Sequence, residues 1–337
     1  MFFSQPALRA ARLLFAAAAL LLPAAPTLAQ GTIQINAIAI DYFDLKDREL
    51  RRFGKLEFRG GLQLTSSTRE FGGISGLRIM PDGSGFLAVT DMGRWLRGRI
   101  TYAGSAPSGI ADAVMAPMLS ADGKRLAARG LWDTEAIADD RGTIYVGIER
   151  KHQIVKFDFA KSGFKARAVA VPVPDEFKDF PNNEGIEALA IVPKGQPLAG
   201  TLIAITEKAL DASGNIKGFL LGGPNPGSFS VRLRDDFSVT DTTVLPGGDL
   251  LLLERRYSPW RGAAVRLRRI AAGDLRPGAT VDGEQLLYAD VNQQVDNYEA
   301  LGLHRTASGE LVITIVSDDN FSPLQRTLLM QFTLTGE

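Results

Sequence analysis

The chain has 337 residues, of which 45% are hydrophobic, 23% charged and 8% aromatic. This composition excludes a wholly disordered, collagen-like or coiled-coil protein. Lys and Arg together number 38, as do Asp and Glu, so the formal net charge is zero and nothing favours nucleic acid as a partner. The chain has no cysteine and only two histidines. The missing cysteines exclude disulfides, thiolate nucleophiles and cysteine-ligated zinc or iron–sulfur sites.

The first 29 residues have the pattern of a secretory signal. Arg9 and Arg12 precede an apolar run over residues 13–22, and Thr27 and Ala29 are small residues at the −3 and −1 positions of a cleavage site. The run is too short to span a bilayer comfortably, and no second long apolar run follows. We expect cleavage after Ala29 and an exported protein, periplasmic or secreted, with no transmembrane segment. The alternative is an apolar N-terminal helix that stays attached.

The remaining chain consists of short apolar runs bounded by Gly, Asp or Pro, a pattern typical of strands. No long amphipathic helix competes with them. The clearest runs are residues 32–40, 55–64, 86–89, 144–148, 202–205, 250–253, 311–316 and 327–334. Two stretches rich in Gly, Ala, Pro and Ser, residues 104–130 and 211–230, are expected to be long loops between strands. The sequence therefore predicts an all-β fold.

One unit recurs along the chain: a polar residue, an apolar run, a turn containing Gly, a second apolar run and an acid. The units open at Ser75, Glu135, Glu187, Asp241 and Glu299, and close at Asp91, Glu149, Glu207, Glu254 and Asp318. Successive opening residues lie 60, 52, 54 and 58 positions apart. Antiparallel strand pairs with a period of about 50 residues are typical of β-propeller blades.

The period also predicts the number of blades. The 308 residues left after signal cleavage correspond to about six blades of four antiparallel strands. Five blades are visible as repeats. The sixth would combine residues 327–334 with strands from residues 32–64 and close the ring. We therefore expect a single propeller domain over residues 30–337.

The repeat brings acidic residues to one end of the propeller. In each unit the turn lies near the midpoint between the opening and closing residues, and residues equidistant from a hairpin turn are neighbours. If the two strands are the inner strands of a blade, both positions face the same channel mouth. Nine carboxylates would then meet there: Glu135, Glu187, Asp241, Glu299, Asp91, Glu149, Glu207, Glu254 and Asp318.

Carboxylates this close together need countercharge. Ca²⁺ accepts about six to eight oxygen ligands, and the residues we expect to bind it are Glu135, Glu187, Glu299, Asp241 and Asn183. Arg94, Arg150 and Arg255 follow closing acids and could bind a small phosphorylated or carboxylated ligand. The structural alternative is that these acids and bases form salt bridges between blades.

These groups favour metal-assisted hydrolysis of a phosphoester or related ester. The candidates for the general base are Glu149, Glu207 and Glu254. Arg94, Arg150 and Arg255 would stabilise charge as the leaving group departs.

Five short segments form a recognisable set of motifs: Phe71-Gly-Gly-Ile-Ser-Gly-Leu, Thr90-Asp-Met-Gly-Arg-Trp-Leu, Asn183-Glu-Gly-Ile-Glu-Ala-Leu-Ala, Leu251-Leu-Leu-Glu-Arg-Arg and Asp318-Asp-Asn-Phe-Ser-Pro-Leu-Gln-Arg-Thr. In these motifs the chain resembles the phytase-like domain family, whose bacterial members are called esterase-like activity of phytase family proteins. The resemblance extends over residues 50–335. It implies an exported β-propeller related in architecture to calcium-dependent propeller phosphatases.

A Ser-His-Asp esterase fits the residues less well. Ser75 lacks a glycine two positions after it and opens a strand, whereas a nucleophile elbow needs a strand-to-helix turn. His304 lies inside an apolar run, where a core histidine is expected, and His152 shortly follows Glu149.

Two further functions stay open. One is a non-catalytic propeller that binds a sugar, a peptide or an envelope partner, with Trp95, Trp132, Tyr257 and Trp260 near the mouth. Packing between blades is the structural alternative for these aromatic side chains. The other is a calcium-dependent hydrolase of lactones or sugar acids. In every case we expect a monomer that does not bind nucleic acid.

Overall fold

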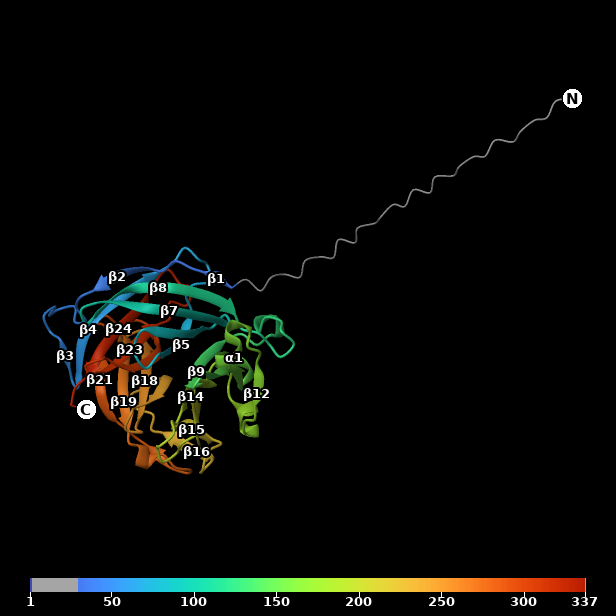
Figure 1. The fold of residues 1–337 in the computed structure, drawn as a ribbon. Helices are drawn as coiled ribbons and strands as arrows, with labels where there is room; N and C mark the ends of the chain where they lie inside the picture. Colours follow the sequence, from blue (N-terminus) through green and yellow to red (C-terminus); the bar gives the residue numbers. More distant parts are fainter. Residues whose placement is uncertain (2–29, 337) are drawn as a thin grey trace.

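The computed structural model describes Met1 and residues 30–336. Five β-sheets follow one another around a common axis (Figure 1), so the prediction of an all-β propeller is confirmed. The expected signal peptide falls on residues 2–29, outside the described residues. Within residues 30–336, no helix combines the length and apolar character needed to cross a bilayer.

Each of the first three blades is built from four consecutive strands. Blade one contains β5 (Ile74–Ile79), β6 (Gly85–Thr90), β7 (Arg94–Ala103) and β8 (Ala106–Pro117), with β1 (Gly31–Thr32) on its outer edge. Blade two contains β9 (Thr134–Asp140), β10 (Thr143–Ile148), β11 (Gln153–Asp158) and β12 (Val169–Val171). Blade three contains β13 (Ile186–Ile191), β14 (Leu202–Leu210), β15 (Ile216–Leu221) and β16 (Gly227–Val231), with β20 (Thr280–Val281) parallel to β16.

The last two blades use strands that are further apart in the sequence. Blade four contains β17 (Ser238–Val244), β18 (Leu250–Ser258), β19 (Gly262–Ile270) and β21 (Glu284–Ala289). Blade five contains β22 (Tyr298–Arg305), β23 (Leu311–Ser317), β24 (Thr327–Leu334), β4 (Leu56–Thr65) and β2 (Asn36–Ile40), with β3 (Arg52–Phe53) beside β4. The described helices are short: α1 (Phe159–Ser162) and the 3-10 turns Ala127–Arg129, Glu149–Lys151, Gly163–Lys165, Asp175–Asp179 and Ala272–Asp274.

The prediction of six blades is wrong, and the pairing of the terminal strands explains why. β24 pairs with both β23 and the N-terminal strand β4. The strands expected to form a sixth blade therefore complete the fifth repeat, which supplies only β22 and β23 by itself. The ring is still closed by N- and C-terminal strands, as predicted. This closure pairs strand edges that would otherwise be open.

The two stretches predicted as long loops are each about half strand. Residues 104–130 contain β8, and residues 211–230 contain β15 and most of β16. Their many small residues hid the strand signal, because propensity depends on apolar and β-branched side chains.

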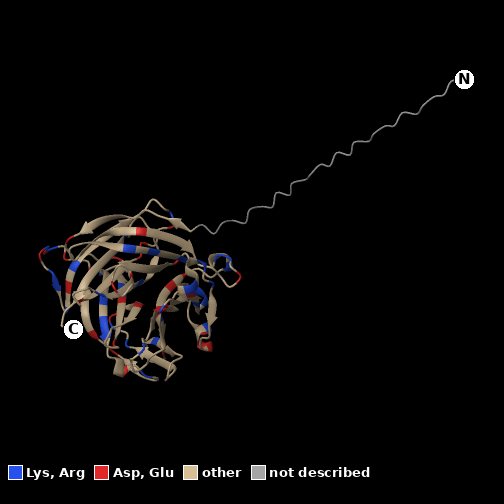
Figure 2. Cartoon of the chain, in the orientation of Figure 1, with Lys and Arg blue, Asp and Glu red and all other residues tan. Residues whose placement is uncertain are grey.

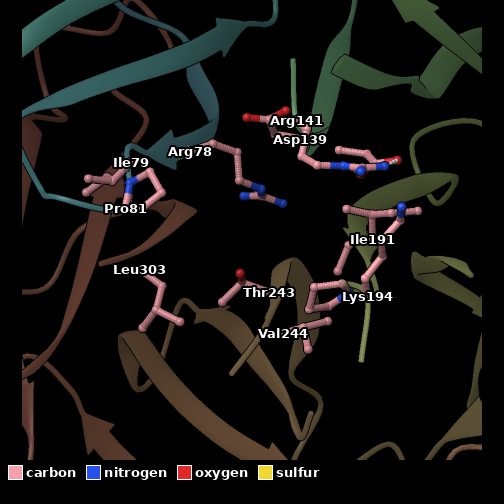
Figure 3. Close-up of a pocket in the computed structure, with 13 residues that line it drawn as sticks. Arg78, Ile79, Pro81, Asp139, Arg141, Ile191, Lys194, Thr243, Val244 and Leu303 are labelled. Carbon is pink, nitrogen blue, oxygen red and sulfur yellow. Dashed lines mark hydrogen bonds and ion pairs between the residues drawn. The ribbon is translucent and has the colours of Figure 1, made fainter. Parts of the chain in front are cut away.

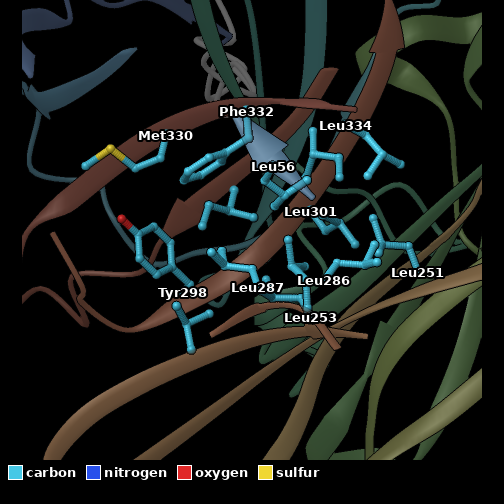
Figure 4. Close-up of a cluster of buried hydrophobic side chains, with 14 of the residues drawn as sticks. Leu56, Leu251, Leu253, Leu286, Leu287, Tyr298, Leu301, Met330, Phe332 and Leu334 are labelled. Carbon is cyan, nitrogen blue, oxygen red and sulfur yellow. The ribbon is translucent and has the colours of Figure 1, made fainter. Parts of the chain in front are cut away.

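The innermost strands β5, β9, β13, β17 and β22 contact one another in order, and β22 returns to β5. Hydrophobic side chains fill the space between neighbouring blades. Figure 4 shows the largest cluster, between blades four and five, where Leu253, Tyr298 and Phe332 are buried together. Burial of apolar surface at each blade boundary stabilises the ring and holds the starts of the inner strands at one end of the channel.

Candidate functional site

Every inner strand carries a β-bulge near its start. In each case one residue has no partner on the neighbouring strand, and the register shifts by one position around it. The five bulged residues are Ser75, Glu135, Glu187, Thr240 and Glu299. A bulge changes the direction of a side chain relative to the regular sheet. The five equivalent bulges therefore form a first ring around one mouth of the channel.

A second ring lies at the end of the next strand in each blade. In four blades an acid at this position donates its backbone N–H to a backbone carbonyl that lies shortly before the inner strand of the same blade. The four pairs are Asp91 with Gly73, Glu149 with Asp133, Glu207 with Gly185, and Asp318 with Asn297. In blade four the equivalent residue is Arg255, which pairs with Ser238. The second ring therefore contains four carboxylates and one guanidinium.

The two rings bring together seven carboxylates, which we call the acidic mouth: Glu135, Glu187, Glu299, Asp91, Glu149, Glu207 and Asp318. Five of them are buried, and Asp91 and Glu207 are partly buried. Figure 2 shows Lys and Arg interspersed with Asp and Glu over the blades. The excess of negative charge is therefore a local property of the mouth and not of the whole molecule.

Burial and mutual repulsion make these carboxylates hard to ionise. Burial, followed by the neighbouring Asp318 and Asp133, raises the pKa of Asp91 to about 7. Burial and the charge of Glu207 raise the pKa of Glu149 to about 7, and burial and Glu299 raise that of Asp318 to about 8. The pKa values of Glu135, Glu187, Glu207 and Glu299 are also raised, chiefly by burial.

Part of the acidic mouth has the geometry of a cation site. Glu149, Glu187 and Glu207 each offer a carboxylate oxygen, and these oxygens lie within 4.8 Å of one another. Two oxygens that bind the same Ca²⁺ at about 2.3–2.6 Å can be at most about 5 Å apart, so the three fit around one ion. In addition, Asp91 Oδ1 is buried and has no hydrogen-bond partner within the described part of the chain. The residues present therefore suit a hard divalent cation.

Two arginines provide positive charge at the mouth. Arg255 donates from Nη1 to Asn297 Oδ1 at 2.6 Å, and its Nη2 lies 3.3 Å from carboxylate oxygens of both Glu207 and Glu299. Arg150 lies on the rim, where Nε donates to Asp133 at 2.7 Å and the guanidinium stacks on Trp132. One partly buried guanidinium inside the ring, that of Arg255, does not balance seven carboxylates.

In blade four, the sequence alignment of the repeat was wrong by one residue at both positions. The structurally equivalent residues are Thr240 and Arg255, not Asp241 and Glu254. A shift of one residue in a strand turns a side chain to the opposite face. The expectation that Asp241 and Glu254 face the acidic mouth is therefore incorrect.

Glu254 is instead enclosed within blade four. It accepts hydrogen bonds from Nε of Arg266 at 2.8 Å and from Nε of Arg268 at 2.7 Å, and all three side chains are almost fully buried. Two guanidinium groups satisfy its two oxygens, so no lone pair is left for a substrate proton. Glu254 is thereby removed as a candidate for the general base.

Asp241 closes the channel below the mouth. Its carboxylate accepts from both terminal nitrogens of Arg78, at 3.1 and 3.2 Å, and from the backbone N–H of Leu301 at 2.8 Å. Arg78 also donates to backbone carbonyls of three other inner strands, including those of Leu189 and Thr242. Burial raises the pKa of Asp241 to about 6, although Arg78 opposes this shift. The pair links the inner strands to one another.

A separate pocket lies on the far side of this pair, at the opposite ends of the inner strands. Figure 3 shows Arg78 pointing into it between Leu303 and Ile191, with Thr243 facing the guanidinium. Because Arg78 and Asp241 lie between the two openings, Asp241 belongs to the channel closure and is not brought to the cation trio.

Other predicted residues lie at the edge of the site or outside it. Arg94 pairs with Glu70 at 3.2 Å, and Asn183 is exposed on the rim, in a pocket shared with Trp132 and Arg150. Trp95 is fully buried and packs edge-on against Phe157. The structural alternative, packing between blades, therefore holds for Trp95.

Three acids at or near the mouth have no individual role in the prediction from sequence. Asp91 and Asp318 enter it only as closing residues, and Asp133 does not enter it. Asp133 precedes the opening residue of blade two by two positions and has a positive φ of 69°, which is uncommon outside glycine. The signal that could have found it is its place directly before an acidic opening motif.

Ser75 does not form a catalytic pair with a histidine in residues 30–336. Its hydroxyl donates to the carbonyl of Gly73 at 3.2 Å. His152 packs edge-on against Phe180, and His304 lies within β22 with an Nδ1 that has no hydrogen-bond partner among the described residues. Their contacts are those of buried structural histidines.

Solved structures similar to this chain have low sequence identity to it. A putative oxidoreductase (glucose dehydrogenase) from Thermus thermophilus is 13% identical with a TM-score of 0.34, covering 88% of this chain and 99% of its own. The β-propeller domain of Cps50 (Swd1) from Myceliophthora thermophila is 13% identical with a TM-score of 0.35, covering 74% and 67%. A protein of unknown function from Bacteroides caccae is 10% identical with a TM-score of 0.32, covering 71% and 67%.

The family comparison is more informative. None of the curated proteins compared with this chain matches it significantly. The family model described as phytase-like, esterase-like activity of phytase, matches residues 69–321. That range includes all seven carboxylates of the acidic mouth. With three quarters of its length matched and a propeller fold to accompany the match, the chain belongs to the phytase-like family.

Proposed function

We propose that the chain is an exported hydrolase that cleaves a phosphoester or related ester of a small anionic substrate at the acidic mouth, with calcium as its cofactor. The observation that carries this proposal is the convergence of seven carboxylates around a single guanidinium inside the ring. Buried carboxylates without a countercharge are costly unless a cation or protons neutralise them. The family description, esterase-like activity, supports the same class of reaction.

Glu149, Glu187 and Glu207 are the residues proposed to hold calcium, because their oxygens are close enough to share one ion. Glu135 and Glu299 lie beside them and would add negative charge to the site. Bound calcium would neutralise charge on the substrate and make a coordinated water more acidic.

Asp91 is the best candidate for the general base. In the metal-free protein its pKa is raised to about 7, and a bound cation would lower it, so Asp91 would be ionised and able to accept a proton at neutral pH. Its buried Oδ1 has no hydrogen-bond partner in the described chain. When water attacks the phosphorus or carbonyl carbon, Asp91 accepts a proton from the water. The bond to the leaving oxygen then breaks, and Asp91 passes the proton to that oxygen, which departs as an alcohol. Glu149, predicted as a base from the sequence, is assigned to the cation trio instead.

Arg150 is proposed to bind the anionic group of the substrate. Its side chain is 48% exposed, and it lines a rim pocket of about 500 Å³ together with Lys151 and Asn183. Asp133 and Trp132 hold the guanidinium in position, so Arg150 can use its remaining N–H groups for a phosphate or carboxylate.

The test combines calcium binding with turnover. We would measure calcium binding by calorimetry, the melting temperature, and hydrolysis of para-nitrophenyl phosphate, a carboxyl ester and a lactone, each with calcium and with chelator. The variant carries Glu149→Gln, Glu187→Gln and Glu207→Gln. The matched control carries Asp112→Asn, Asp175→Asn and Glu284→Gln, which remove three exposed carboxylates elsewhere.

We expect calcium to raise the melting temperature of the parent and the control but not of the variant, and chelator to abolish hydrolysis. Turnover that survives both chelator and the triple substitution would contradict the metal-assisted reaction. Calcium binding without turnover of any ester would favour the non-catalytic binding protein instead. Exposed Trp132 and Trp260 provide some support for that second candidate.

A further inference from the structure

A groove opens at the mouth end of the boundary between blades four and five. One wall is the hairpin of β18 and β19, and the other comes from the loops before β22 and after β23. The groove has a volume of about 590 Å³, and its lining includes Arg255, Tyr257, Ala263, Val295, Asn297 and Leu324. None of the roles proposed above for the acidic mouth uses Tyr257, Val295 or Leu324.

The inner end of the groove joins the acidic mouth. Arg255 and Asn297 line the groove, and Nη1 of Arg255 donates a hydrogen bond of 2.6 Å to Oδ1 of Asn297. Nη2 of the same arginine reaches Glu207 and Glu299. A ligand whose reacting group lies over the carboxylates could therefore extend past Arg255 into the groove without leaving the site.

The outer part of the groove carries large, highly exposed apolar side chains beside polar lining residues such as Ser322 and Gln325. Tyr257 on one wall is 75% exposed, and Leu324 on the other wall is 91% exposed. Trp260, at the tip of the same hairpin as Tyr257, is 95% exposed. Large apolar side chains on both walls of a concavity are typical of a surface that becomes covered when a ligand binds.

We infer that this groove is a subsite for an aromatic or branched apolar group of the ester substrate, and that Tyr257 and Leu324 determine this specificity. The inference rests on the proposed function, because the acidic mouth is taken as the place where the ester lies. It narrows the substrate class to amphipathic esters, with a charged group at the mouth and an apolar group in the groove. A polyol phosphate would leave the apolar walls uncovered.

Binding measured by calorimetry on the calcium-loaded protein tests this subsite. The probes are 1-naphthyl phosphate, glycerol phosphate and 1-naphthol. We expect 1-naphthyl phosphate to bind about tenfold more tightly than glycerol phosphate, because the ring buries apolar surface in the groove. Tyr257→Ser combined with Leu324→Ser should remove that difference, and Leu324→Ser alone should reduce it.

The matched control carries Ile38→Ser and Val169→Ser, two exposed apolar residues on outer strands. It should keep the tenfold preference. All variants should keep the melting temperature of the parent within a few degrees, since the replaced side chains are exposed. A loss of preference in a folded groove variant but not in the control supports the subsite.

The probes also separate this inference from the proposed function. If neither calcium nor the phosphates bind, the proposed hydrolase fails, but 1-naphthol binding that depends on Tyr257 and Leu324 would still support an apolar subsite. Equal affinities for naphthyl and glycerol phosphate in the parent would overturn the inference. So would a naphthyl preference that persists in the double groove variant.

Discussion

Two groups of buried carboxylates in this molecule have opposite environments. In blade four, Glu254 is held between Arg266 and Arg268, and every oxygen has a cationic donor. At the acidic mouth, seven carboxylates share one guanidinium, that of Arg255, and one oxygen of Asp91 has no hydrogen-bond partner within the described chain. Both groups come from the same sequence repeat.

This difference in countercharge distinguishes a buried carboxylate with a structural role from one with a role in binding. Buried ion pairs complete within the chain need nothing from outside, and their energetic role is to avoid an unpaired charge. Carboxylates that the chain itself leaves unbalanced must be neutralised by protons or by a ligand. An acid in a repeat therefore indicates a binding site only when its own countercharge is missing.

The largest expected effect is a dependence of stability on pH in the metal-free protein, because several mouth carboxylates act together. The raised pKa values of Asp91, Glu149 and Asp318, about 7 to 8, mean that the folded protein retains protons that the unfolded chain releases near pH 4. The free energy of unfolding should therefore fall as the pH rises from about 4 to about 8. Melting temperatures in chelator across this range measure it.

Calcium should reduce this fall, because a bound cation replaces the protons. A variant with Asp91→Asn, Glu149→Gln and Asp318→Asn should show a flatter profile in chelator, since these groups no longer titrate. A melting temperature that climbs steadily with pH in the metal-free parent would show that the mouth carboxylates are already balanced in the folded chain.

The second-largest effect is expected on the free energy of unfolding when Glu254, the acid paired with two arginines, is replaced. Glu254→Gln leaves the buried guanidinium groups of Arg266 and Arg268 with only their more exposed carboxylate partners, Asp235 at 3.5 Å and Asp282 at 2.8 Å, and should lower the free energy of unfolding by about 3–5 kcal/mol. Glu187→Gln, measured in chelator, removes a buried carboxylate that has no complete countercharge and should be neutral or stabilising. Urea denaturation of both variants checks the comparison, and equal losses would remove the distinction between the two groups.

The smallest effect on the free energy of unfolding is expected at the Asp241–Arg78 ion pair, which closes the channel. Asp241→Asn removes the ion pair with Arg78, but Arg78 keeps its backbone carbonyl partners, so we expect a loss of about 1–3 kcal/mol. The calcium-induced rise in melting temperature should persist, because Asp241 lies away from the acidic mouth. Loss of calcium binding with unchanged stability would return Asp241 to the set of metal ligands predicted from the sequence.

Several features could be predicted because they depend on local pattern. Alternating apolar runs gave strands such as β10 and β24, and hairpin symmetry placed Glu135 with Glu149 and Glu187 with Glu207 at one end of their blades. The regular spacing of the repeated units along the chain predicted blades arranged around an axis. Arg255, whose positive charge offsets part of the negative charge of the acidic mouth, was predicted as a ligand-binding residue because it follows a closing acid.

The amino-acid sequence by itself determined the all-β character, the propeller repeat and the presence of acids at its opening and closing positions, since these follow from side-chain periodicity along the chain. Only the tertiary structure decided that β4 and β24 complete the fifth blade, because strand pairing between distant segments leaves no local pattern. It also decided the bulge register of blade four. In that blade a one-residue shift in register placed Thr240 and Arg255 at the mouth. The same shift turned Asp241 and Glu254 toward arginines that lie far away in the sequence or on another strand.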